Sequence, residues 1–248
     1  MKTIYILWLR QIKRHLRSKP RMIGSLGQPI LFLLAFGYGF GSVFQQAGQG
    51  NYIQFLAPGI IGISILFTAM FSGIELIWDR QFGFLKETLV APVSRFDIMM
   101  GRTLGGATVA TMQGVIVLLI CLLAGFHPYS WITIPATLGV MLLISFVFTG
   151  FGTVVASRLT DMQGFQLIMN FLIMPLFFLS GALFPLRGLP QTLDILAKID
   201  PLSYGIDALR SLLINTQYFG LGLDLAVLLC CAALVLILGS YSFAKMEA

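Results

Sequence analysis

Charged side chains gather in one stretch of this sequence, which reads DRQFGFLKETLVAPVSRFDIMMGR from Asp79 to Arg102. Its charged members are Asp79, Arg80, Lys86, Glu87, Arg95, Asp97 and Arg102. Long apolar segments flank this charged stretch, so we expect it to lie in water or at a membrane surface. The chemistry that it supports is docking, because a short amphipathic helix fits a groove on another protein. A helix that is merely solvated at the interface fits the same residues.

Catalytic chemistry is not indicated anywhere in the sequence. There is no nucleophile elbow, HExxH, CxxC or phosphate-binding GxxxxGK[ST] motif. Asp194 and Asp200 are close in sequence, but neither His15 nor His127 is near them. The three cysteines lie in apolar segments without metal-ligand spacing. We therefore predict no catalytic residue, no metal site and no cofactor bound by this chain.

The composition is that of a membrane protein. Hydrophobic residues make up 57% of the chain and charged residues 10%, against about 25% charged in soluble domains. The apolar residues form blocks of about 20 without alternation, which indicates helices rather than barrel strands. We predict an all-α polytopic membrane protein, with residues 1–248 as a single domain. Its six predicted transmembrane helices are 22–44, 55–78, 103–125, 132–156, 164–184 and 221–243.

The distribution of basic residues predicts the orientation. Seven of the 16 Lys and Arg residues lie in the first 21 positions, and four more lie in the charged stretch. Because positive charge accumulates on the cytoplasmic side, we expect both termini and the charged stretch to be cytoplasmic, in the cell inner (plasma) membrane. The net charge of +6 therefore reflects membrane orientation, and no nucleic-acid partner is predicted.

The first residues, 3–19, are predicted to form an amphipathic helix in the plane of the membrane interface. Basic residues on one face would meet anionic lipid headgroups. The apolar face consists of Tyr5, Trp8, Leu9, Ile12 and Leu16, and the basic face of Arg10, Lys13, Arg14 and Arg17. The charged region is too long for a signal peptide, and no small-residue cleavage site follows it.

The segment 185–215 is punctuated by Pro185, Pro190 and Pro201. Its two short amphipathic stretches are too short to cross a bilayer, so we expect half-helices at the outer surface or dipping partly back into the membrane. Glu75 and Asp224 are the ionisable residues inside the predicted spans, and we expect both at the depth of the membrane interface.

Two segments resemble the type-2 ATP-binding-cassette (ABC) export permeases. In the charged stretch the matching residues are Asp79, Arg80, Gly83, Phe84, Leu85, Glu87, Leu89, Val90, Pro92 and Arg95. Phe84 stands where threonine is commoner in that family. The second segment lies at 179–210, where the matching residues are Ser180, Gly181, Phe184, Pro185, Leu189, Pro190, Asp200, Pro201, Leu202, Tyr204, Asp207, Leu209 and Arg210.

The resemblance implies a half-transporter. Two permease chains would pair, as identical copies or as paralogues, and each would dock a separate cytoplasmic ABC ATPase that binds ATP and Mg. Residues 82–90 would be the coupling helix, with Arg80, Gly83, Phe84, Leu85, Glu87, Leu89 and Pro92 as its coupling residues. The re-entrant segment 185–215 would form an outer gate, with Ser180, Gly181, Phe184, Pro185, Pro201, Tyr204, Asp207 and Arg210 as gate residues.

Large soft side chains are candidates for the substrate path. They are Phe67, Met70, Phe71, Asn170, Met174 and Phe177. If these side chains line the path, they suit a hydrophobic drug-like compound or a lipid; core or lipid-facing positions are the alternative. A polysaccharide or glycolipid cargo is also open, because aromatic rings stack on sugars. An ion-coupled carrier is disfavoured, since only Gln113 and Asn170 are polar near the midplane. A membrane scaffold or assembly factor that transports nothing is a third hypothesis for the function.

Overall fold

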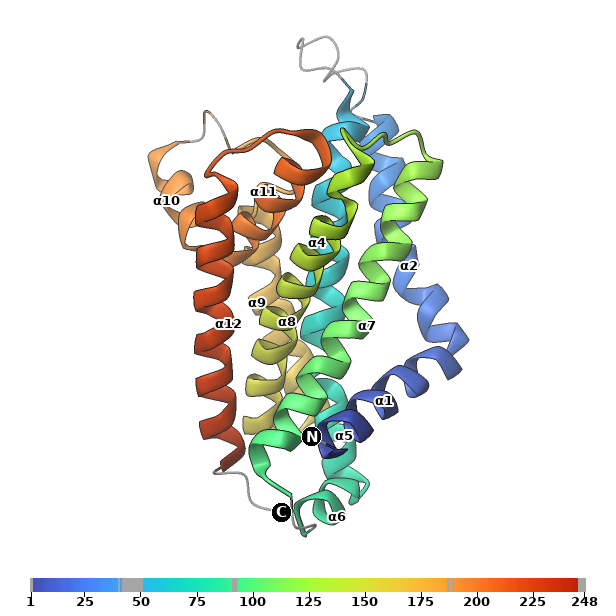
Figure 1. Cartoon of the computed structure of the whole chain (residues 1–248), viewed down its shortest axis with the longest axis vertical. Helices are drawn as coiled ribbons and strands as arrows, with labels where there is room; N and C mark the ends of the chain where they lie inside the picture. The colour runs from blue at the N-terminus through green and yellow to red at the C-terminus, as the bar shows by residue number, and fades with distance from the viewer. Residues whose placement is uncertain are drawn as a thin grey trace.

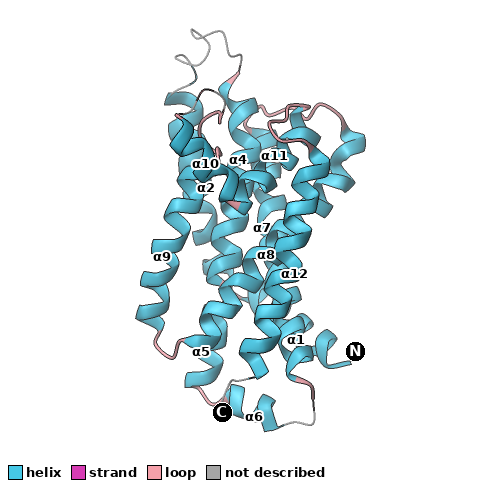
Figure 2. Ribbon diagram, turned by 90° about the vertical axis from the view of Figure 1, so that its left-hand side faces the viewer, coloured by secondary structure: helices cyan, strands magenta, loops and turns pink. Residues whose placement is uncertain are grey.

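The computed structural model describes residues 2–39, 41, 51–90, 93–186, 188 and 190–244, and their regular secondary structure is helical (Figures 1 and 2). This confirms the all-α prediction. The helices are α1 (Lys2–Arg17), α2 (Lys19–Gly39), α4 (Tyr52–Phe71), α5 (Ile74–Gln81), α6 (Phe84–Val90), α7 (Arg95–Leu123), the 3-10 turn η1 (Trp131–Thr133), α8 (Ile134–Arg158), α9 (Met162–Leu179), α10 (Gln191–Ile199), α11 (Pro201–Ile214) and α12 (Leu221–Ala244).

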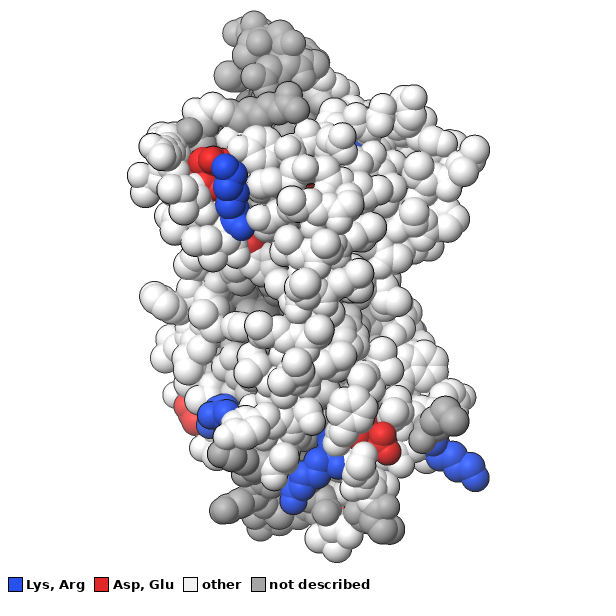
Figure 3. All heavy atoms as spheres, turned by 60° about the vertical axis from the view of Figure 1, so that its left-hand side comes forward, with Lys and Arg blue, Asp and Glu red and all other residues white. Residues whose placement is uncertain are grey.

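Five helical segments of the described chain are long and apolar enough to cross a membrane. They are Tyr52–Gln81, Arg95–Leu123, Trp131–Arg158, Met162–Leu179 and Leu221–Ala244. The apolar part of α2, Met22–Gly37, is shorter. The end of the expected first span at 22–44 lies outside the described residues, so a sixth span stays a prediction. On the face shown in Figure 3, charged side chains lie toward the two ends of the molecule, and an uncharged band separates them.

Helix α4 is the centre of the bundle. It packs against α7, α8, α11, α2 and α9, and most of its apolar side chains are buried. Close approach depends on small residues, as expected where helices meet in a membrane. At Gly152 of α8, for example, a Cβ would collide with the carbonyl oxygen of Met70 in α4.

The charged stretch begins at Asp79, in the last turn of α5, the helix that follows α4. Helix α5 ends at Gln81, and Gly83 turns the chain with φ of +79° before α6 begins at Phe84. Figure 1 shows α6 hanging beyond the lower end of the bundle. Helix α7 then begins at Arg95, eight residues before the expected span, because the Ser94 side chain accepts a hydrogen bond from the Asp97 backbone N–H and caps it.

Helix α1 crosses the lower end of the bundle obliquely (Figure 1). It packs on α7, where a Cβ at Gly105 would lie 2.6 Å from the Gln11 side chain. The position of this helix in the membrane interface stays a prediction, but the protein covers part of its surface. Leu7 and His15 are buried against the protein, whereas Tyr5 and Leu16 are exposed. Neighbouring helices, rather than lipid alone, select the buried face.

Helices α10 and α11 lie at the opposite end of the bundle from α6 (Figure 1). With 9 and 14 residues, neither is long enough to cross a bilayer. Pro201 occupies the first turn of α11, and the Asp200 carboxylate accepts from the Leu202 backbone N–H at 2.8 Å as its N-cap. Their depth in the membrane stays a prediction.

Candidate coupling site

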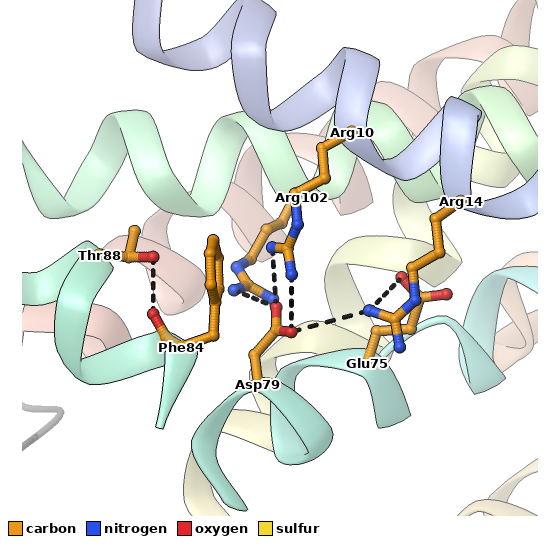
Figure 4. A network of polar contacts seen from close by, with 7 residues as sticks. All are labelled: Arg10, Arg14, Glu75, Asp79, Phe84, Thr88 and Arg102. Carbon is orange, nitrogen blue, oxygen red and sulfur yellow. Dashed lines mark hydrogen bonds and ion pairs between the residues drawn. The ribbon is translucent and has the colours of Figure 1, made fainter. Parts of the chain in front are cut away.

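A buried carboxylate joins three helices at the lower end of the bundle (Figure 4). Asp79 of α5 accepts hydrogen bonds from Arg10 of α1 at 3.1 and 3.0 Å, and from Arg102 of α7 at 2.6 Å. Asp79 and Arg102 are 6% and 4% exposed. Within the stretch that we expected in water or at a membrane surface, these two end residues are therefore buried inside the protein.

A second arginine of α1 extends this network. The Nη1 atom of Arg14 lies 3.7 Å from an Asp79 oxygen and 3.9 Å from an oxygen of Glu75, one turn earlier in α5. Glu75 is buried as well. The interface depth expected for it stays a prediction. We call Arg10, Arg14, Glu75, Asp79 and Arg102 the Asp79 cluster.

The Asp79 cluster holds α1, α5 and α7 together as one body. Taking a charge out of water is costly, and a buried pair survives only when geometry and hydrogen bonding are good. Here three guanidinium groups surround two carboxylates. Moving one of these helices away from the others would leave a buried charge without its counterpart, which is strongly unfavourable.

Helix α6 is tied to the Asp79 cluster at its first residue. The Arg10 guanidinium carbon lies 3.7 Å from the centroid of the Phe84 ring, a cation–π contact. Thr88 donates to the Phe84 carbonyl oxygen at 2.9 Å, which keeps this turn of α6 closed (Figure 4). Arg10 thus contacts Asp79 and Phe84 at once, so it links α6 to the bundle.

Arg80 anchors the other side of α5. It donates to the backbone oxygens of Leu159 at 2.8 Å and Ser157 at 3.1 Å, at the end of α8. A structural role as an anchor therefore accompanies the coupling role predicted for Arg80.

The free surface of α6 is partly apolar. Phe82, just before the helix, is 80% exposed and Val90, its last residue, is 83% exposed. Glu87 is exposed between them. These exposed side chains would be available for contact with another protein. The side chains of Leu85 and Leu89, and the whole of Pro92, lie outside the described residues.

Comparison with known proteins decides the family. The model of the ABC-2 type transporter family matches residues 2–214 of this chain. The chain belongs to this family. Nodulation protein J of Rhizobium meliloti (strain 1021) is 26% identical over 216 residues, which cover 86% of this chain and 81% of the relative. The protein named "Putative transport permease ycf38" of Pyropia yezoensis is 31% identical over 212 residues, which cover 79% of this chain and 68% of the relative.

Family membership confirms the resemblance drawn from the sequence. An ABC-2 permease is the transport subunit of an ATP-driven complex, and the ATPase is a separate subunit. Together with the five apolar helices, membership makes this chain a multi-pass membrane protein.

Several of the residues expected in a gate lie at the end of the bundle opposite α6. Arg210 donates to the Gly181 carbonyl oxygen at 2.7 Å and its guanidinium carbon lies 4.0 Å from the Phe55 ring centroid; burial lowers the pKa of Arg210 to about 10. Asp207 accepts from the backbone N–H groups of Tyr218 and Phe219 at 2.8 and 2.7 Å.

The remaining gate candidates have local partners. Tyr204 donates to the Lys198 carbonyl oxygen at 2.7 Å, and Ser180 to that of Phe177 at 2.8 Å. Phe184 is partly exposed. Pro185 lines a hollow of about 660 Å³ together with Asp207 and Arg210. Asp224 is fully buried in α12, and its carboxylate has no hydrogen-bond partner among the described residues. The interface depth expected for it stays a prediction.

The six path candidates do not line one surface. Phe67 and Phe71 of α4 line a cavity of about 210 Å³ between α1, α2, α4, α5 and α7. Phe177 stacks on Phe32, which also lines this cavity, at 5.6 Å between ring centroids. Met70 is in the core, whereas Asn170 and Met174 lie on the exposed face of α9.

Sequence reasoning overlooked the Asp79 cluster, although a signal was present. Arg10 and Arg14 are four residues apart in one helix, and Glu75 and Asp79 are four residues apart in another. Residues at this spacing share a helix face. Two acids on one face near the end of an apolar span need partners, and the matching arginines were available in the first helix.

Proposed function

We propose that this chain is the membrane subunit of an exporter that moves a hydrophobic or amphipathic compound, drug-like or lipid, out of the cytoplasm or the inner leaflet. Two permease chains, identical or paralogous, pair in the plasma membrane with both termini in the cytoplasm. Each docks one ATPase subunit, which binds ATP and Mg. The permease alternates between inward-open and outward-open states as the ATPase pair closes and reopens.

The observation that carries this proposal is the cation–π contact between Phe84 of α6 and Arg10 of the Asp79 cluster. Helix α6 projects beyond the bundle, where the ATPase would reach it, and Arg10 contacts both Phe84 and Asp79. A displacement of α6 pulls on Arg10. Because the charges of the cluster are costly to separate, α1, α5 and α7 follow as one body.

The chain of contacts continues into the bundle. Helix α5 follows α4 after a break at Ser72 and Gly73, and Arg80 of α5 holds the end of α8. The cavity lined by Phe67 and Phe71 lies directly beside this break, since Ser72 also lines it. Movement of α5 would therefore change the shape of the cavity where an amphipathic cargo would lie.

The proposal is tested by reconstituting the permease with its ATPase in proteoliposomes. The two subunits are expected to copurify in gentle detergent, and an amphipathic cargo is expected to stimulate ATP hydrolysis. Glu87→Ala should remove this stimulation while membrane insertion stays normal, because the Glu87 side chain is exposed. A permease that binds no ATPase, or coupling that survives Glu87→Ala unchanged, would contradict the assignment of α6.

A further inference from the structure

The cavity beside the α4–α5 break has two unlike walls. Its volume of about 210 Å³ far exceeds the 10–15 Å³, roughly, that one water molecule needs. One wall is apolar and aromatic, with Phe32, Phe67 and Phe71. The other carries amides and hydroxyls, among them Gln11, Gln28 and Thr68. A cavity of this kind fits a molecule with one apolar and one polar part.

Three of the polar groups lack partners inside the protein. Ser64 and Ser72 donate to carbonyl oxygens of their own helix, at 2.8 and 2.6 Å. In the described part of the chain, by contrast, the side chains of the half-buried Gln11 and Thr68 and of the exposed Gln28 make no hydrogen bond with the protein. Two amides and one hydroxyl both donate and accept. They therefore suit a ligand whose own groups both donate and accept hydrogen bonds.

The charge at this cavity is already compensated. Glu75 lines it, but its carboxylate faces Arg14 at 3.9 Å within the Asp79 cluster. His15, which also lines it, is buried and has partners of its own. A cationic or anionic head would lose its hydration and find no unpaired counter-charge, which is costly. An uncharged head avoids this cost.

We propose that this cavity binds the head of an amphiphile that is uncharged and bears hydroxyl or amide groups, such as a sugar, while its alkyl chain lies against Phe32, Phe67 and Phe71. In taking this amphiphile to be the cargo, the inference rests on the proposed function. The binding itself requires only the permease, so it is measured without the ATPase.

Photolabelling tests the site directly. The permease is placed in phosphatidylcholine nanodiscs with a dodecyl glucoside that carries a diazirine on the sugar, and labelled peptides are identified by mass spectrometry. Labels are expected in α2 and α4 near Gln28 and Thr68. Unlabelled dodecyl glucoside should compete at least about tenfold better than dodecyl sulfate or dodecyltrimethylammonium, because the charged heads remain uncompensated. Equal competition, or labels spread over the exposed face of α12, would overturn the proposal.

Two glycines of α2 provide a matched pair of variants. A Cβ at Gly24 or at Gly27 would meet no atom within 4 Å, but only Gly24 lines the cavity. Gly24→Leu should fold normally and lower the labelling more than about tenfold, since the added side chain takes the ligand's space. Gly27→Leu should label like the wild type. Equal labelling of the two variants would refute the site.

A third variant removes one hydrogen bond without changing the shape. Thr68→Val should weaken dodecyl glucoside binding about three- to tenfold, as expected for the loss of one hydroxyl partner. Dodecyltrimethylammonium binding should not change. If Thr68→Val binds both amphiphiles as the wild type does, the polar wall does not recognise the head. The failure of ATPase coupling in a separate experiment would instead refute the proposed function and leave the labelling unaffected.

Discussion

The Arg102 guanidinium of α7 lies 2.6 Å from the Asp79 carboxylate of α5, and both side chains are buried. These residues are the first and last of the charged stretch, with α6 between them. The salt bridge closes the base of the loop that carries α6. Because Asp79 also binds Arg10, which stacks on Phe84, one carboxylate positions both ends of the loop and its helix.

Asp79→Asn should destabilise the protein strongly. The substitution leaves Arg10 and Arg102 next to a neutral amide, and removing one partner of a buried ion pair costs about 3–5 kcal/mol. Thermal unfolding in nanodiscs measures the loss. Asp97→Asn is the matched control, because Asp97 lies in the same charged stretch and makes no ion pair with a described residue. A destabilisation no larger than that of Asp97→Asn would show that the cluster is not structural.

Phe84→Leu should weaken coupling more than stability. The leucine keeps an apolar side chain but removes the ring under the Arg10 guanidinium, a contact worth about 0.5–2 kcal/mol. Cargo-stimulated ATP hydrolysis is expected to fall, whereas the melting temperature changes little. Phe84→Tyr retains the ring and should couple normally. If the leucine and tyrosine variants couple equally well, the cation–π contact does not transmit the motion of α6.

Gly83→Pro should abolish coupling without preventing membrane insertion. Gly83 has φ of +79° in the turn before α6, and proline fixes φ near about −65°. The turn must therefore change direction and carry α6 away from Arg10. Gly83→Ala, which strains the same turn but can still adopt it, should retain part of the cargo-stimulated ATPase activity. Full coupling in the proline variant would exclude α6 as the docking element.

Much of the fold followed from the sequence because long apolar blocks must be helical in a membrane. Helix α12 at Leu221–Ala244 differs by one residue from the expected 221–243. Charge counting, however, assigns residues to a side of the membrane and says nothing about partners. It assigned Asp79 and Arg102 to a cytoplasmic stretch in water or at the membrane surface, and it could not show that each satisfies the other inside the protein.

A similar limit applies to the faces of α1. An amphipathic pattern indicates which side chains avoid water, but protein and lipid both accept apolar groups. Leu7 and Gln11 face α7, while Tyr5 and Leu16 remain exposed. The choice depends on the glycines of α7, a contact between residues about a hundred positions apart, which no local pattern in the first helix records.

Stability should fall as the pH rises, because of Asp200. Its carboxylate is 4% exposed, and one of its oxygens has no hydrogen-bond partner among the described residues. Burial raises the pKa of Asp200 from 3.8 to about 8, so the folded protein holds a proton there that the unfolded chain releases. Between these two values the folded state binds more protons than the unfolded state, so the free energy of unfolding decreases with rising pH.

Asp200→Asn isolates this contribution. The amide oxygen can still accept the hydrogen bond from the Leu202 backbone N–H that caps α11, but the side chain no longer titrates. Thermal unfolding between about pH 5 and about pH 9 is expected to show a shallower decline in the variant, which should be the more stable protein at the alkaline end. Asp194→Asn serves as the control, because a hydrogen bond from Lys198 lowers the pKa of Asp194. The shift of its pKa is therefore opposite in direction to that of Asp200. An Asp200→Asn variant with the same pH slope as the wild type would mean that the Asp200 carboxylate is ionised throughout this range, and that solvent or a neighbouring chain reaches it.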